Sequence, residues 1–244
     1  MRLNRVYSDT PIIAGEELQL PEASAYHVAR VLRLRAGAPL VVFDGSGADF
    51  RCEVTVVEGD RVRARAMQRM AGLGESPLAV TLVQGISRGE RMDWTLQKAT
   101  ELGVRAIVPV LSARSVVRLD EKQAAAKLRH WRGIVVAACE QCGRSTIPEV
   151  RPPLDLGAFF ATAPREGQRL VLNPVGQRSL AGLASAAARI ELLIGPEGGL
   201  EDAELSAAER AGFAPVRLGP RVLRTETAAV AALSVLQALW GDLQ

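Results

Sequence analysis

Two glycine-containing segments near the C-terminus carry the residue types with the clearest chemical potential. Residues 193–199 read LIGPEGG, an apolar run that ends in three glycines, a proline and a glutamate. Residues 218–227 read LGPRVLRTET and add two arginines, two threonines and a second glutamate. Glycine-rich loops that follow strands often cradle a phosphate with backbone N–H groups at a helix N-terminus. The first question is therefore whether these loops bind phosphate.

Several features of the first loop argue against phosphate. Pro196 removes one backbone N–H, and Glu197 puts a negative charge inside the loop. The following helix already carries acidic side chains in its first turns, which satisfy the positive end of its dipole: Glu201, Asp202 and Glu204. The phosphate-binding patterns GxxxxGK(S/T) and GxGxxG do not occur in the chain.

A ligand without phosphate suits these residues better. Glycines let a flat base approach the backbone closely, and a carboxylate suits ribose hydroxyls or a cation. S-adenosylmethionine (SAM) combines an adenine, a ribose and a sulfonium cation and has no phosphate. The alternative is that the glycines only form tight turns and that Glu197 is a solvated loop charge.

The elements around these loops alternate between apolar strands and amphipathic helices from residue 78 onward. This alternation predicts an α/β fold with a mostly parallel sheet covered by helices on both faces. The predicted strands are 78–85, 106–112, 169–174, 191–196 and 215–219, and the predicted helices are 93–104, with Asp93 as N-cap, 120–143, 179–188, 200–211 and 224–240. Ligands bind beyond the carboxyl ends of such strands, so we expect the two loops to lie side by side.

The first 70 residues have a different pattern. Strand-like runs at 39–45, 49–59 and 60–68 follow one helical segment at 23–37, which predicts a small barrel-like β-domain. Residues 71–77, AGLGESP, have the composition of a linker.

Composition limits the function classes without choosing one. The 244 residues carry a net charge of +3, and the pI near 9.0 permits an acidic partner such as RNA. No apolar run is long enough to span a bilayer, and three cysteines indicate a reducing, cytoplasmic setting. Cys139 and Cys142 form a CxxC pair that lacks two further zinc ligands, so no metal is expected.

With these residues in view, the chain resembles a known family. LIGPEGGL (193–200) followed by LGPRVLRTETAA (218–229) closely resembles the bacterial 16S ribosomal RNA methyltransferases that modify uridine N3, within the SPOUT superfamily. Three further segments agree in the expected order: RVLRLRAGAPLVVFDGSG (30–47), ERMDWTLQKATELGVRAIVPVLSARS (90–115) and ACEQCGRSTIPEV (138–150).

The resemblance implies a PUA-like RNA-binding domain over residues 1–72 and a SPOUT methyltransferase domain over 77–244, with a C-terminal trefoil knot. It implies that SAM is the methyl donor and that the substrate is a uridine of 16S rRNA in the assembled small subunit. The alternatives are another rRNA or tRNA base, or a non-catalytic assembly factor. The implied cofactor residues are Leu172, Ile194, Gly195, Glu197, Gly199, Leu218, Gly219, Leu223, Arg224 and Thr225.

Catalytic and RNA-binding candidates follow from the same resemblance. Arg224 and Arg114 are candidates to stabilise charge on the uracil, and Glu226 is a candidate to take the N3 proton, as are Glu197 and solvent. For any single arginine, a phosphate contact or a surface ion pair is the alternative. The RNA-binding candidates are His27, Arg30, Arg33 and Arg144. The last helix is apolar almost all round at 228–240, which fits a homodimer interface or, alternatively, a central core helix.

Overall fold

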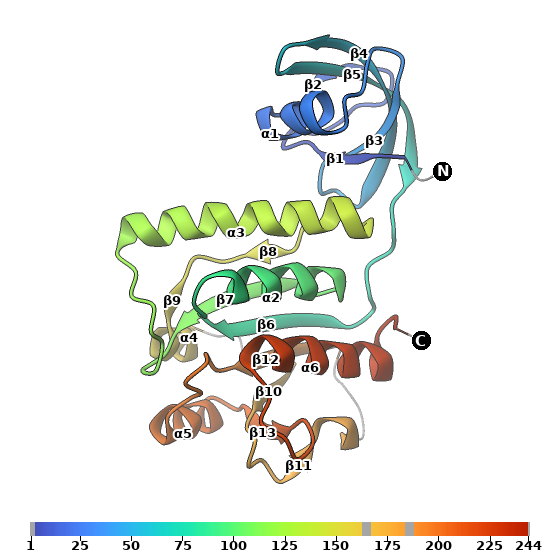
Figure 1. The fold of residues 1–244 in the computed structure, drawn as a ribbon. Helices are drawn as coiled ribbons and strands as arrows, with labels where there is room; N and C mark the ends of the chain where they lie inside the picture. Colours follow the sequence, from blue (N-terminus) through green and yellow to red (C-terminus); the bar gives the residue numbers. More distant parts are fainter. Residues whose placement is uncertain (1–2, 163–166, 184–187, 244) are drawn as a thin grey trace. The chain divides into compact units, whose positions relative to one another are not determined.

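The computed structural model describes residues 3–162, 167–183 and 188–243 (Figure 1). The chain divides into two compact units. Unit 1 comprises Met1–Glu75 and Val136–Ile147, and unit 2 comprises Ser76–Val135 and Pro148–Gln244. The sequence had assigned the segment Val136–Ile147 to the C-terminal domain, whereas it packs with the N-terminal residues. The long helix α3 (Glu121–Cys142) therefore contributes residues to both units.

Unit 1 is built on a five-stranded sheet in the order β1-β3-β4-β5-β2. Its strands are β1 (Arg5–Tyr7), β2 (Glu17–Gln19), β3 (Pro39–Phe43), β4 (Ala48–Glu58) and β5 (Arg61–Ala71). Only β1 and β3 pair in parallel; the other pairs are antiparallel. The helix expected at 23–37 is shorter: α1 (Glu22–Tyr26) continues as one π-helical stretch, η1 (His27–Val31). It ends there because Arg33 adopts a left-handed backbone, with φ of 53°.

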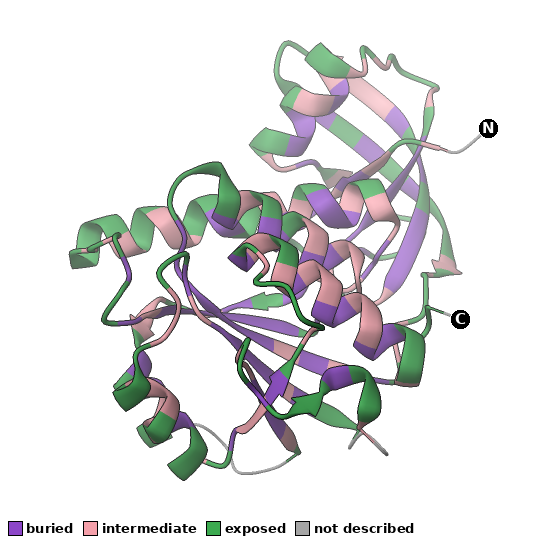
Figure 2. Ribbon diagram, turned by 60° about the horizontal axis from the view of Figure 1, so that its bottom comes forward, coloured by how far each residue is buried: buried purple, intermediate pink, exposed green. Residues whose placement is uncertain are grey.

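Unit 2 contains an entirely parallel sheet of eight strands, which confirms the predicted fold class. The order is β11-β13-β10-β12-β6-β7-β8, with β9 also pairing with β7. The strands are β6 (Ala79–Gly85), β7 (Ala106–Leu111), β8 (Glu149–Val150), β9 (Leu154–Asp155), β10 (Gln168–Leu172), β11 (Arg178–Ser179), β12 (Arg189–Ile194) and β13 (Ala214–Arg217). Both faces of the central strands are buried, so their sequences read as continuous apolar runs rather than as alternation (Figure 2).

Helices cover both faces of this sheet. α4 (Leu156–Thr162) and α5 (Asp202–Arg210) pack over one face, where Phe159 and Ala208 meet Val83 and Leu193. α2 (Glu90–Glu101) and α6 (Thr225–Trp240) pack against each other, and α6 also contacts β12 (Figure 1). None of the helices within the described residues is long and apolar enough to cross a membrane.

Two helix predictions need correction. α2 begins three residues before Asp93, with Gly89 as N-cap at a positive φ of 57°. Asp93 instead lies in the first turn, where its carboxylate contacts the His130 imidazole at 2.8 Å. The helix expected at 179–188 is only a 3-10 turn, η2 (Leu180–Gly182), and residues 184–187 lie outside the described part of the chain.

Candidate functional site

A pocket of about 490 Å³ opens at the carboxyl ends of β10, β12 and β13. Segment 194–200 forms one wall, and segment 218–226 forms the wall opposite. The structure thus brings together two loops that are separated by helix α5 and strand β13 in the sequence. All ten residues expected to bind the cofactor line this pocket: Leu172, Ile194, Gly195, Glu197, Gly199, Leu218, Gly219, Leu223, Arg224 and Thr225.

Acidic side chains occupy the start of the helix that follows the GPEGG loop. Glu201 caps α5, and its backbone N–H donates to the Glu204 carboxylate at 2.8 Å in a reciprocal capping box. The other Glu204 oxygen accepts from the Ala113 N–H at 2.8 Å. Two carboxylates therefore occupy the positive end of this helix, which makes the pocket a poor site for phosphate.

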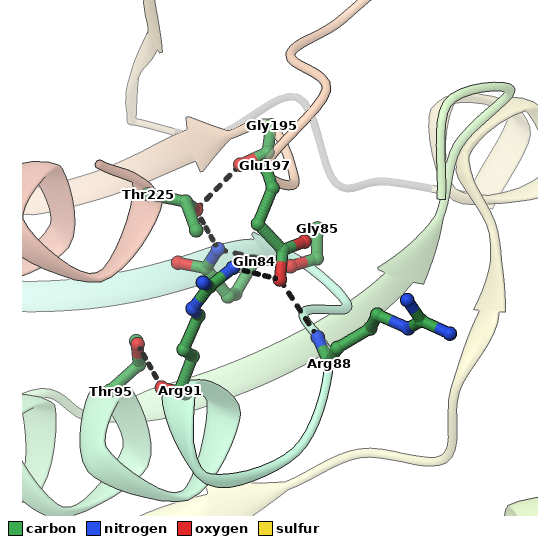
Figure 3. A network of polar contacts seen from close by, with 8 residues as sticks. All are labelled: Gln84, Gly85, Arg88, Arg91, Thr95, Gly195, Glu197 and Thr225. Carbon is green, nitrogen blue, oxygen red and sulfur yellow. Dashed lines mark hydrogen bonds and ion pairs between the residues drawn. The ribbon is translucent and has the colours of Figure 1, made fainter. Parts of the chain in front are cut away.

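Hydrogen bonds beneath the pocket tie the two loops to β6 (Figure 3). The Thr225 hydroxyl donates to the Gly195 carbonyl at 2.7 Å and accepts from the Gln84 amide nitrogen at 2.9 Å. Gln84 is fully buried and pairs in register with Ile194 in the sheet. One threonine therefore joins the first turn of α6, the start of the GPEGG loop and the end of β6.

Close backbone packing at Gly85 holds the same loop from below. A β-carbon at Gly85 would lie 2.4 Å from the Pro196 nitrogen and 2.8 Å from the Gly195 carbonyl carbon. The loop closes on itself through the Gly199 N–H, which donates to the Pro196 carbonyl at 2.9 Å, with Gly199 at a φ of 71°. Only glycine at 85 allows this approach without moving the loop.

Glu197 is held by the connection between β6 and α2. One carboxylate oxygen accepts from the Arg88 N–H at 2.9 Å and from the Arg91 guanidinium at 3.2 Å (Figure 3). Partial burial acts to raise the pKa of this carboxyl, but these hydrogen bonds outweigh it and hold the pKa below its usual value. Glu197 is therefore ionised at neutral pH and anchors the loop, although it also lines the pocket.

Comparison with known proteins places the chain in a family. Residues 74–237 match the family described as RNA methyltransferase domain, and residues 20–66 match the RNA methyltransferase PUA domain. The chain is 34% identical to the ribosomal RNA small subunit methyltransferase E of Bacillus subtilis, with 92% of this chain and 88% of that protein covered. This chain belongs to the ribosomal RNA small subunit methyltransferase E family.

Other members of the family support the same assignment. The Mycobacterium tuberculosis methyltransferase E is 35% identical, with 96% of this chain and 90% of that protein covered. The crystal structure of the Neisseria gonorrhoeae methyltransferase E, bound to S-adenosyl methionine, is 40% identical, with a TM-score of 0.92 and complete coverage of both chains. A Legionella pneumophila structure in complex with the bound cofactor SAM is 41% identical, with a TM-score of 0.96 and complete coverage of both.

Of the three residues expected to be catalytic, two line the pocket and one contacts the GPEGG loop. Arg224 lines the pocket as the exposed N-cap of α6, and Glu226 lines it from the first helical turn. The Glu226 Oε2 atom is buried and has no hydrogen-bond partner among the described residues. Arg114 supports the loop instead: its guanidinium donates to the Gly198 carbonyl at 3.1 Å and lies 3.8 Å from the Glu201 carboxylate.

The four residues expected to bind RNA all belong to unit 1. Arg33 is exposed, His27 is half-buried in η1, and Arg30 forms an exposed ion pair with Asp60 at 2.7 Å. Arg144 does not fit the expectation, because it is 4% exposed and its guanidinium pairs with Glu75. A buried guanidinium already paired with a carboxylate has no surface to offer to RNA.

Two of the three cysteines, Cys52 and Cys139, are buried in the core, and Cys142 is partly exposed. Burial raises the pKa of the Cys139 thiol to about 12 and that of the Cys52 thiol to about 11. Neither forms the thiolate that zinc or a redox site requires at neutral pH.

Sequence reasoning missed the residues that support the loop from β6 and α2: Gln84, Gly85, Arg88 and Arg91. Gln84 and Gly85 stand at the end of an apolar strand in the sequence, and this position is the signal that could have pointed to them. That signal is weak because a strand-terminal glycine usually marks nothing more than a turn.

Proposed function

We propose that this protein is a SAM-dependent methyltransferase that methylates N3 of a uridine in 16S rRNA. The observation that carries the proposal is the pocket between the GPEGG loop and segment 218–226, beside a helix N-terminus already filled by Glu201 and Glu204. Such a pocket suits a nucleoside that carries no phosphate. The related structures from Neisseria gonorrhoeae and Legionella pneumophila were determined with SAM.

The residues present fit this cofactor. Gly195, Gly199 and Gly219 allow the adenine to approach the main chain, and apolar side chains such as Ile194 and Leu218 flank it. When bound, SAM supplies an electrophilic methyl group. None of these contacts requires a metal ion.

The residues around the pocket account for the remaining chemistry. Uridine N3 carries a proton in its neutral form, so the base must be unpaired or flipped out and must lose that proton. Arg224, at the mouth of the pocket, stabilises the negative charge that develops on the uracil oxygens. Glu226 is our candidate to accept the proton, since it lines the pocket and one of its oxygens has no hydrogen-bond partner in the described part of the chain.

The role of Arg224 can be separated from cofactor binding. Its side chain makes no capping hydrogen bond to α6, so Arg224→Ala should leave the helix intact. We expect kcat to fall about 100- to 1,000-fold, the usual effect of losing one charge-stabilising donor, while SAM affinity changes little. Single-turnover methylation and calorimetric SAM titration measure the two effects. Equal losses in both would make Arg224 a binding residue instead.

One experiment tests the function directly. The protein is incubated with isotope-labelled SAM and small ribosomal subunits that lack the modification, in a buffer whose Mg²⁺ keeps the subunits assembled. The rRNA is then digested and its nucleosides are identified by mass spectrometry. Methyl on uridine N3 is the expected product, whereas methyl on another base selects a related methyltransferase and no transfer at all selects the assembly factor. Naked rRNA in parallel tests whether the assembled subunit is the substrate, as we propose.

We further propose that the protein acts in the cytoplasm as a homodimer joined through α6. In the single chain, Val230 and Val235 of this apolar helix are only partly buried, and Leu239 is 41% exposed. Apolar side chains left on one helix are typical of a subunit contact. Light scattering should give twice the 26.1 kDa chain mass, and Val235→Glu should give the monomer. A wild-type monomer would overturn this assembly.

A further inference from the structure

One short segment of unit 2 is strongly basic. Residues 113–132 contain six Arg or Lys and two acidic residues, a net charge of +4. The whole chain carries +3, so all other residues together carry −1. Two of the three lysines of the chain, Lys122 and Lys127, lie in this segment. The segment is thus an electropositive region of unit 2, although the net charge of the whole chain is small.

The structure arranges part of this segment around a surface pocket of about 510 Å³, separate from the pocket between the two loops. We name this pocket the basic groove; it is lined by Arg118, Leu119, Gln123, Ala126, Lys127 and His130. Four of these residues lie on α3. Ala126, Lys127 and His130 follow Gln123 by three, four and seven positions, so all four share one face of the helix. Asp93 of α2 holds the His130 ring through one nitrogen at 2.8 Å, which fixes the imidazole at the edge of the groove.

The cations of the groove are available to a ligand. Within the part of the chain that the structure describes, neither Arg118 nor Lys127 forms an ion pair. The acidic residue Asp120 is used by the helix itself, since its carboxylate accepts from the Gln123 N–H at 2.7 Å. In unit 1, by contrast, Arg5, Arg30, Arg63 and Arg144 are all paired with carboxylates.

The chemistry of the groove fits a phosphate backbone. A guanidinium, an ammonium and an imidazole converge there, and a guanidinium can bind a phosphate in a bidentate manner. The only apolar side chains in the groove are Leu119 and Ala126, which are too small to anchor a protein partner. Arg118 and Lys127 can bind an anion without breaking an ion pair that the described residues form, whereas His130 keeps its contact with Asp93.

We propose that the basic groove is an RNA-backbone site through which unit 2 itself grips its rRNA substrate, in addition to any contact made by the PUA domain. The site rests on the proposed rRNA methyltransferase function. It contributes affinity and orientation but no sequence readout, because phosphate contacts are the same for every base.

A charge-reversal pair tests the groove. Arg118→Glu with Lys127→Glu is compared with Arg178→Glu plus Arg210→Glu, which makes the same charge change at two exposed residues of unit 2 that line neither pocket. Binding of small ribosomal subunits that lack the modification is measured by fluorescence anisotropy of the labelled protein over a series of KCl concentrations at constant Mg²⁺. Calorimetry of SAM binding checks that each variant is folded.

We expect the groove variant to bind these subunits about 10- to 100-fold more weakly and to lower the slope of log K against log salt by about 2, one for each lost phosphate contact. Its SAM affinity should equal that of wild type, and the matched control should retain most of its affinity for the subunits. Equal losses in the two variants, or no loss in the groove variant, overturn the RNA site. If wild type still methylates uridine N3 in either case, the proposed function stands.

Discussion

Gly85→Ala is expected to weaken SAM binding by about 5- to 150-fold. The added methyl group would lie 2.4 Å from the Pro196 nitrogen, a backbone atom that cannot rotate away. The GPEGG loop must therefore move, and overpacking of this kind costs about 1–3 kcal/mol, which is a factor of about 5 to 150 if the displaced loop bears it. Calorimetric titration with SAM measures the loss.

Gly133→Ala is the matched control for this substitution. Gly133 lies within α3, and a β-carbon there would meet no atom within 4 Å. This variant should bind SAM as wild type does and should gain stability, by up to about 1 kcal/mol, from the better helix propensity of alanine. Circular dichroism would show whether Gly85→Ala keeps its secondary structure. Wild-type affinity in a folded Gly85→Ala protein would show that the loop does not depend on this contact.

Thr225→Val should produce the second large effect. Valine has nearly the same shape, so the change removes the hydroxyl without opening a cavity. It leaves the Gly195 carbonyl without its 2.7 Å donor and takes from the Gln84 amide its 2.9 Å acceptor. A buried polar group left unsatisfied costs about 1–3 kcal/mol, which corresponds to a loss of SAM affinity of about 5- to 150-fold if the free energy falls on the loop.

Two further variants separate the hydroxyl from other effects at this position. Thr225→Ser keeps the hydroxyl and should restore most of the affinity. Gln84→Leu removes the partner below, so in a double-mutant cycle its effect should add less than fully to that of Thr225→Val. If serine fails to rescue, or the two effects are simply additive, the bonds between Gln84, Thr225 and Gly195 do not position the loop.

The sequence by itself determined the fold class and the two walls of the pocket. The central strands of the parallel sheet are buried on both faces. Their sequences are therefore mostly apolar runs, which identify each strand from its own residues. The two loops follow β12 and β13 directly, and parallel strands place all such loops at one edge. Pro196 and Glu197, which disfavour phosphate binding, lie within the loop itself and could be identified from the sequence.

Only the tertiary structure showed which residues support the two loops of the pocket and which arginine side chains form no ion pair among the described residues. Gln84 and Gly85 act through contacts with residues more than 100 positions away. The identity of a strand-terminal glycine does not indicate which distant segment packs against it. Arg144 and Arg118 have the same chemical type in the sequence, yet Arg144 is buried against Glu75 and Arg118 lines an open groove. Burial and pairing of a charge depend on which distant segments the chain brings together, and residue type alone does not encode that.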